Sequence, residues 1–138
     1  MNPVHREARV DFAEALFRTG DTTEARARLE WFAEAASGDA QAPRALLLLA
    51  EINEASGQHG LALAAYDRVD REYPRAPRPA KSLLAHGCLL QEMGQAAVCE
   101  QLLEAAIEQG DPEVAGEASY RLAAILHGEG RHVRAVEV

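Results

Sequence analysis

The sequence predicts an all-α solenoid of antiparallel helix pairs, with about four repeats of which the last is incomplete. Three observations lead to this fold class. Glycines return at a nearly constant interval, residues of matching size return at fixed distances from each glycine, and alanine is abundant while aromatic residues make up only 5% of the chain. Alanine is the least costly residue in a helix and lets neighbouring backbones approach, so the composition favours closely packed helices.

The repeat is set by four glycines, Gly20, Gly57, Gly94 and Gly130, which stand 37, 37 and 36 residues apart. Small residues recur five positions after and seven positions before them: Ala25, Ala62, Cys99 and Ala135, then Ala13, Ala50, Gly87 and Ala123. Larger residues recur eight and four positions before them: Phe12, Leu49, His86 and Leu122, then Leu16, Asn53, Leu90 and Leu126. A helix-turn-helix unit explains this register, because a left-handed glycine ends the first helix and the small residues mark where the two helices cross.

Each repeat is therefore expected to form two helices. The expected ranges are 4–19 and 22–36, 43–56 and 59–73, 80–93 and 96–109, then 112–129 and a short helix from 131. Local signals support several of these limits. Asp21 followed by Glu24 is typical of a helix start, and so is Asp111 followed by Pro112. Three prolines within residues 74–79 interrupt the chain between the second and third pairs.

The repeat resembles the tetratricopeptide repeat, whose pattern is W-x-x-L-G-x-x-Y, then A-x-x-x-F, then P. The likeness is carried by "LLLLAEIN", "ALAAY" and Pro74 in the second repeat, and by "LLAHGCLL" and "CEQLL" in the third. It covers nearly the whole chain and implies a right-handed superhelix. The interval exceeds the family's usual 34 residues. In its longer repeat interval, the stretch "REYPRAPRPAKSLLAHGCLLQEMG" is similar to the repeats of bacterial envelope proteins, such as the Tol-Pal coordinator and outer-membrane assembly lipoproteins.

One domain is expected over residues 1–138, with repeats at approximately 6–40, 43–79, 80–111 and 112–138. The formal charge of −8 argues against a nucleic-acid partner, whose phosphates need a basic face. No apolar run approaches the ~20 residues of a membrane span, and the start "MNPVHREARVDF" lacks the apolar segment of a signal peptide. We therefore expect a cytoplasmic protein without membrane insertion. A periplasmic location is the alternative if the sequence is a piece excised from an exported protein.

No grouping of residues predicts catalysis. His86 and Cys88 stand two apart on one expected helix and therefore point to different faces. The two cysteines, Cys88 and Cys99, are too few for a disulfide framework and lack the C-x-x-C spacing of a zinc or redox site. The glycines occur singly, without the pattern of a phosphate-binding loop. We expect a protein that is not an enzyme and that uses neither a cofactor nor a metal.

The resemblance implies a concave groove lined by the first helix of each pair. The lining residues carried over by position are Asp11, Glu14, Phe17, Arg44, Leu47, Glu51, Glu54, Lys81, Leu84, Cys88, Gln91, Tyr120 and Arg121, with Val10, Leu48, Ala85, Glu117 and His127 beside them. Exposed leucines and Tyr120 would be costly to leave in water as a patch, so we interpret them as anchors for a partner. Leu48 is equally expected to pack between helices. The glutamates cluster toward one end, which favours a basic or amphipathic helical ligand, with a solvated acidic face as the alternative.

The sequence therefore predicts a protein-protein interaction scaffold or adaptor that binds a peptide or helix of a partner in its groove. The first alternative is a self-assembly module. The chain stops about two turns into its last expected helix, so Ile125, Leu126 and Val136 would lack a full cover, and a homo-oligomer could form through this C-terminal end. The second alternative is a regulatory repeat segment of a longer multidomain bacterial protein.

Overall fold

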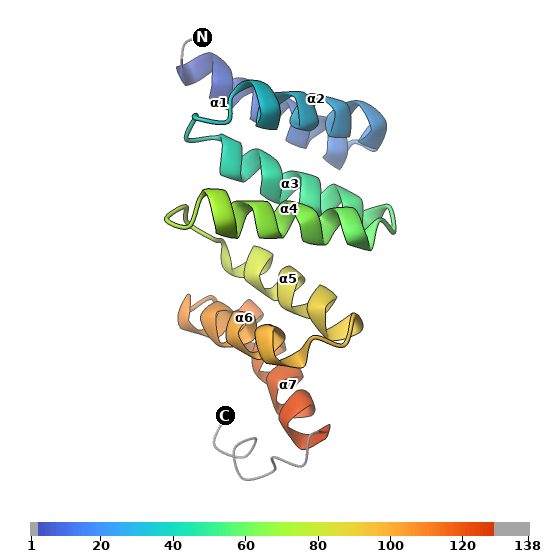
Figure 1. The fold of residues 1–138 in the computed structure, drawn as a ribbon, viewed down its shortest axis with the longest axis vertical. Coiled ribbons are helices and arrows are strands. Elements are labelled where there is room, and N and C mark those ends of the chain that lie inside the picture. Colours follow the sequence, from blue (N-terminus) through green and yellow to red (C-terminus); the bar gives the residue numbers. More distant parts are fainter. Residues whose placement is uncertain (1–2, 129–138) are drawn as a thin grey trace. The chain divides into compact units, whose positions relative to one another are not determined.

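The computed structural model describes residues 3–128, and within them the chain forms helices and no strand (Figure 1). The helices are α1 (Pro3–Arg18), α2 (Thr22–Ala35), α3 (Ala42–Ala55), α4 (His59–Glu72), α5 (Ala80–Glu92), α6 (Ala96–Glu108) and α7 (Pro112–Gly128). Each expected helix in this range begins and ends within one residue of its predicted limits, and the predicted all-α fold of helix pairs is confirmed. The short helix expected from residue 131, and Val136 with it, lies outside the described residues.

The chain divides into two compact units, Met1–Ala76 and Pro77–Val138, here called unit 1 and unit 2. In unit 1, α2 packs against both α1 and α3, α3 packs against α4, and α1 also contacts α3 (Figure 1). In unit 2, α6 packs against both α5 and α7, and α5 contacts α7. We call α1, α3, α5 and α7 first helices and α2, α4 and α6 second helices. The single domain predicted over residues 1–138 stays a prediction.

Three glycines end the first helices in the same way. Gly20, Gly57 and Gly94 have φ angles of 99°, 77° and 79°, in the left-handed region that favours glycine. The amide of Gly57 donates to the carbonyl of Glu54, and the next amide donates to the carbonyl of Asn53. The same two hydrogen bonds recur after α1 and α5. These two hydrogen bonds together form the Schellman motif, so the role predicted for the repeat glycines is confirmed at these three positions.

Side-chain caps fix two helix starts, as the sequence predicts. The carboxylate of Asp21 accepts a hydrogen bond from the amide of Glu24 at 3.4 Å, and that of Asp111 accepts from the amide of Val114 at 3.3 Å. Each cap satisfies an amide that has no partner inside its helix. These caps set the start of α2 and of α7.

The small residues of the repeat lie in the core, where the two helices of a pair cross. Ala25, Ala62 and Cys99 are buried on the second helices, and Ala13 and Ala50 on the first. Gly87 occupies the matching position on α5, where an added methyl group would lie 3.2 Å from Cδ2 of Leu103. The pair α5 and α6 therefore crosses with less space than an alanine needs without adjustment of its neighbour.

One of the larger repeat positions is filled by a polar side chain in unit 2. His86 stands where α3 and α7 carry Leu49 and Leu122, and it is only 2% exposed. Its Nδ1 lies 3.3 Å from a guanidinium nitrogen of Arg78. Burial, together with the nearby charge of Arg78, lowers the pKa of His86 from 6.5 to about 4. The imidazole is therefore held in its neutral form inside the fold.

None of the helices that the structure describes is both long and apolar enough to cross a lipid bilayer.

Candidate functional site

The predicted groove residues of unit 1 form a linked array of charges between α1 and α3. A guanidinium nitrogen of Arg44 on α3 lies 2.7 Å from Oδ1 of Asp11 and 3.5 Å from Oε1 of Glu14, both on α1. Arg18, at the end of α1, binds Glu51 on α3 at 2.8 Å and lies 3.9 Å from Glu14. The hydrogen bond to Glu51 is the main cause that raises the pKa of Arg18. The array therefore joins four predicted residues through an arginine, Arg18, that the sequence prediction missed.

The remaining predicted residues of unit 1 differ in exposure. Leu47 and Phe17 are half-buried, whereas Val10 and Leu48 are buried in the core. Packing between helices, the alternative kept open for Leu48, is therefore the arrangement that the structure shows. Glu54 is half-buried and accepts a hydrogen bond from the hydroxyl of Tyr66 on α4 at 3.1 Å.

In unit 2 the predicted residues lie on α5 and α7. Arg121 on α7 donates to Glu117 at 2.8 Å and to the side-chain oxygen of Gln91 on α5 at 3.5 Å. The bond to Gln91 links the two first helices, and the bond to Glu117, within α7, is the main cause that raises the pKa of Arg121. The others are Leu84, Ala85 and Cys88, which are half-buried, and Lys81, Tyr120 and His127, which are exposed. Tyr120, at 75%, is the most exposed large apolar side chain of the described residues.

The thiols lie in different surroundings. Cys99 is buried, and its burial is the main cause that raises the pKa of the thiol to about 11. Cys88 is half-buried, and neither cysteine forms a disulfide. Within residues 3–128, no three side chains of histidine, cysteine, aspartate or glutamate gather in a way that could hold a metal ion.

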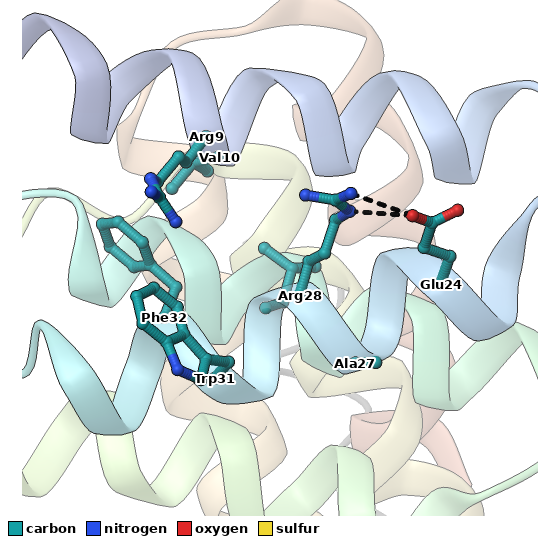
Figure 2. Close-up of a pocket in the computed structure, with 8 residues that line it drawn as sticks. Arg9, Val10, Glu24, Ala27, Arg28, Trp31 and Phe32 are labelled. Carbon is teal, nitrogen blue, oxygen red and sulfur yellow. Dashed lines mark hydrogen bonds and ion pairs between the residues drawn. The ribbon is translucent and has the colours of Figure 1, made fainter.

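Unit 1 also contains a cavity of about 340 Å³ that the sequence analysis did not identify. Its lining residues come from α1 and α2 and are Arg9, Val10, Glu24, Ala27, Arg28, Leu29, Trp31 and Phe32. Figure 2 shows Arg9 directed toward the rings of Trp31 and Phe32, and Arg28 bonded to Glu24. The guanidinium carbon of Arg9 lies 5.3 Å from the Trp31 ring centre, which is within the range of a cation–π contact.

The cavity was missed because its exposed residues Arg9, Arg28 and Trp31 break the repeat pattern. Trp31 is the single tryptophan of the chain, and the matching positions of the next two repeats hold Arg68 and Ala105. A tryptophan that occurs once contributes nothing to the recurring pattern of residues. The signal that could have found the site was the nearby pairing of exposed aromatic and arginine positions on two neighbouring helices.

The fold is a series of antiparallel helix pairs. The charged residues between α1 and α3 and the cavity between α1 and α2 both lie at its surface. The tetratricopeptide repeat profile matches residues 10–77 and 84–138. The chain therefore belongs to the tetratricopeptide repeat family, which comprises scaffolds for protein interactions. The predicted likeness to the longer repeats of envelope proteins stays a prediction.

Solved structures agree with this fold. MamA superposes with a TM-score of 0.72 at 18% identity, over 99% of this chain and 75% of that one. The type III secretion translocator chaperone SycD of Yersinia enterocolitica, in an alternative dimer, gives 0.71 at 21% identity, over 90% and 93%. A MamA fragment from Desulfovibrio magneticus RS-1 gives 0.61 at 18% identity, over 96% and 89%. No curated protein sequence matches the chain significantly.

Proposed function

We propose that this chain is a non-catalytic adaptor whose first helices bind a peptide or helix of a partner protein. One repeat position carries the proposal, ten residues before the repeat glycines. It holds Leu47 on α3, Leu84 on α5 and Tyr120 on α7, which reach the surface, and Val10 on α1, which is buried. Large apolar side chains at the surface suit the anchors of a bound segment, Leu47 on unit 1 and Leu84 with Tyr120 on unit 2, since a few residues supply most of the binding energy in an interface.

The charges beside these anchors favour a ligand with basic residues. The first-helix face of unit 1 carries the carboxylates of Asp11, Glu14 and Glu51 and the guanidinium groups of Arg18 and Arg44, which leaves one carboxylate in excess. Each of these ion pairs lies at the surface and is partly exposed to solvent, and surface pairs contribute about 0–1 kcal/mol. A basic side chain of a ligand can therefore compete for these carboxylates at little cost.

The test is affinity capture from a lysate of the source cell, with partners identified by mass spectrometry. The variants are Tyr120→Ser and the double variant Leu47→Glu with Leu84→Glu. Leu61→Glu on α4 is the matched control, because Leu61 is 55% exposed but lies on a second helix. We expect a partner that the wild type and the control retain and that the two groove variants lose. Equal capture by all four folded proteins would refute the proposal.

A further inference from the structure

An apolar stripe on α1 is exposed where its counterparts are buried. Ala8, Phe12 and Ala15 share one face of α1 through their spacing of four and three residues. All three are exposed, and Phe12 is 49% exposed. The same repeat positions hold Ala45, Leu49 and Ile52 on α3, and Ala118, Leu122 and Ile125 on α7, and all six are buried. We call Ala8, Phe12 and Ala15 the α1 stripe.

The difference follows from the neighbours of each first helix. α3 packs against α4, its own second helix, and also against α2, the second helix of the preceding pair. α7 likewise packs against α6, the second helix of the pair before it. Among the described residues the main neighbours of α1 are α2 and α3, and neither is a second helix that precedes α1. The shape that fits the α1 stripe is therefore a helix.

Two arginines border this surface at positions where other repeats hold apolar residues. Arg9 aligns with the buried Leu46 and Leu83, and Arg28 aligns with the buried Ala65. The Arg28 guanidinium lies 4.8 Å from the ring centre of Phe12, so the α1 stripe and the cavity of Figure 2 are continuous.

The net charge at the cavity is positive, on a chain whose formal charge is −8. Glu24 is the carboxylate that lines the cavity, and it is bound to Arg28 at 2.9 Å. Arg9 has no carboxylate within ion-pair distance in the described part of the chain. A ligand that brings carboxylates to this edge would therefore meet a cation that has not already been neutralised.

We propose that the α1 stripe and the adjoining cavity form a docking site for an acidic amphipathic helix of a partner protein. Its apolar side chains cover Phe12 and enter the cavity beside Trp31, and its carboxylates face Arg9 and Arg28. This chain offers a template for such a ligand in α6, which carries Glu100, Glu104 and Glu108 and no basic residue. In a second copy of the chain the apolar side of α6 is already buried, with Cys99, Leu103 and Ala106 in the core, so α6 itself is not the occupant, and the proposal assigns the site to a helix of another protein.

The probe for the test is a synthetic peptide of residues 95–109, acetylated, amidated and carrying Cys99→Ala. It contains no tryptophan, so the emission of Trp31, the single tryptophan of the protein and 52% exposed, reports on coverage of the site. We expect titration with the peptide to shift Trp31 emission to shorter wavelength. A peptide with Glu100, Glu104 and Glu108 all changed to lysine is expected to bind at least tenfold more weakly, as is the acidic peptide to Arg9→Glu protein.

The matched control for Arg9→Glu is Arg71→Glu, the same charge change at an exposed arginine on α4 of the same unit, and it is expected to leave binding unchanged. Tyr120→Ser is also expected to bind normally, which separates this site from the face of the proposed function. Phe12→Ser removes the centre of the stripe and should abolish binding. If that variant is unfolded by circular dichroism, the comparison of acidic and basic peptides on wild-type protein decides.

Three results would overturn the proposal. The first is equal affinity for the acidic and the basic peptide. The second is Trp31 emission that stays constant throughout the titration of wild-type protein. The third is a blue shift of Trp31 emission on raising the concentration of protein alone, with a dimer in sedimentation that Arg9→Glu or Phe12→Ser removes, because the occupant would then be a second copy.

Discussion

The buried histidine makes the stability of the protein depend on pH in a window that can be measured. The pKa of His86 is 6.5 in the unfolded chain and about 4 in the fold. Between these values the unfolded chain binds a proton that the folded protein excludes, so the free energy of unfolding falls as pH falls. The contribution is complete above pH 6.5 and is lost progressively toward pH 4. At about 1.4 kcal/mol per pH unit the total is about 3 kcal/mol, a large share of the 5–15 kcal/mol typical of a domain.

The variant His86→Leu isolates this effect, since leucine fills the same repeat position on α3 and α7. Arg78 loses an acceptor in the variant, which costs about 1–3 kcal/mol at every pH and leaves the slope unaffected. Urea unfolding at pH 7, 6, 5 and 4.5, followed by circular dichroism, gives the free energy for both proteins. We expect the variant to lose at least 2 kcal/mol less than the wild type across this range.

Other groups also make the free energy of unfolding depend on pH. Their contributions cancel when the free energy of His86→Leu is subtracted from that of the wild type. Arg6 and the amide of Gln41 lower the pKa of Asp39, so its contribution is lost only at more acidic pH and is the same in both proteins. His59→Gln, which removes an exposed histidine, is the control for the loss of a histidine elsewhere, in unit 1. If wild type and His86→Leu lose stability in parallel between pH 6.5 and 4.5, His86 is not held neutral and the reasoning fails.

Three further substitutions test the fold by thermal or urea unfolding. Gly94→Ala forces a left-handed alanine at the end of α5 and is expected to destabilise by about 1 kcal/mol, although an added methyl group meets no atom within 4 Å. Gly116→Ala, inside α7 and equally open, is expected to stabilise by about 0.5–1 kcal/mol, and the same sign for both would contradict the assigned turn. Asn53 is buried, and its Oδ1 has no hydrogen-bond partner in the described structure. Leucine fills its repeat position on α5 and α7, so Asn53→Leu is expected to stabilise by about 1–2 kcal/mol, and a loss of stability would show that the amide is satisfied.

The helix limits were predictable because their signals are local. A left-handed glycine such as Gly57 ends a helix, and a carboxylate such as Asp21 starts one, whatever the rest of the chain does. The small core residues were predictable for a different reason, since the repeat shows the same crossing several times. His86 and Asn53 are polar residues at repeat positions that hold leucine elsewhere. Their burial could be predicted only by assuming that the repeat position, and not the polarity of the side chain, decides whether a residue is buried.

The pairing of charges was not predicted, although the repeat contains the information. In unit 1 the ion pairs Arg6 with Asp39, Arg18 with Glu51, and Arg44 with Asp11 each join residues 33 apart. This separation in sequence is one repeat interval minus about one helical turn. Residues with this separation come close together on neighbouring first helices and their connections. A search for opposite charges at this separation would have found Arg18. Counting glutamates alone overstated how acidic the face is.

The helix α1 separates two surfaces of opposite charge, and this bears on what an adaptor of this kind can do. Asp11, Glu14 and Arg18 recur at three and four residues on one side of α1, while Ala8, Phe12 and Ala15 recur at four and three on another. Adjacent residues on a helix point about 100° apart, so a ligand on the first side and a ligand on the second need not collide. The first side has carboxylates in excess and the second has arginines, so each surface repels the ligand that suits the other. Two proteins of unlike charge could therefore be held at once on unit 1, and binding at the two faces should be additive, with Arg9→Glu weakening one ligand and Leu47→Glu the other.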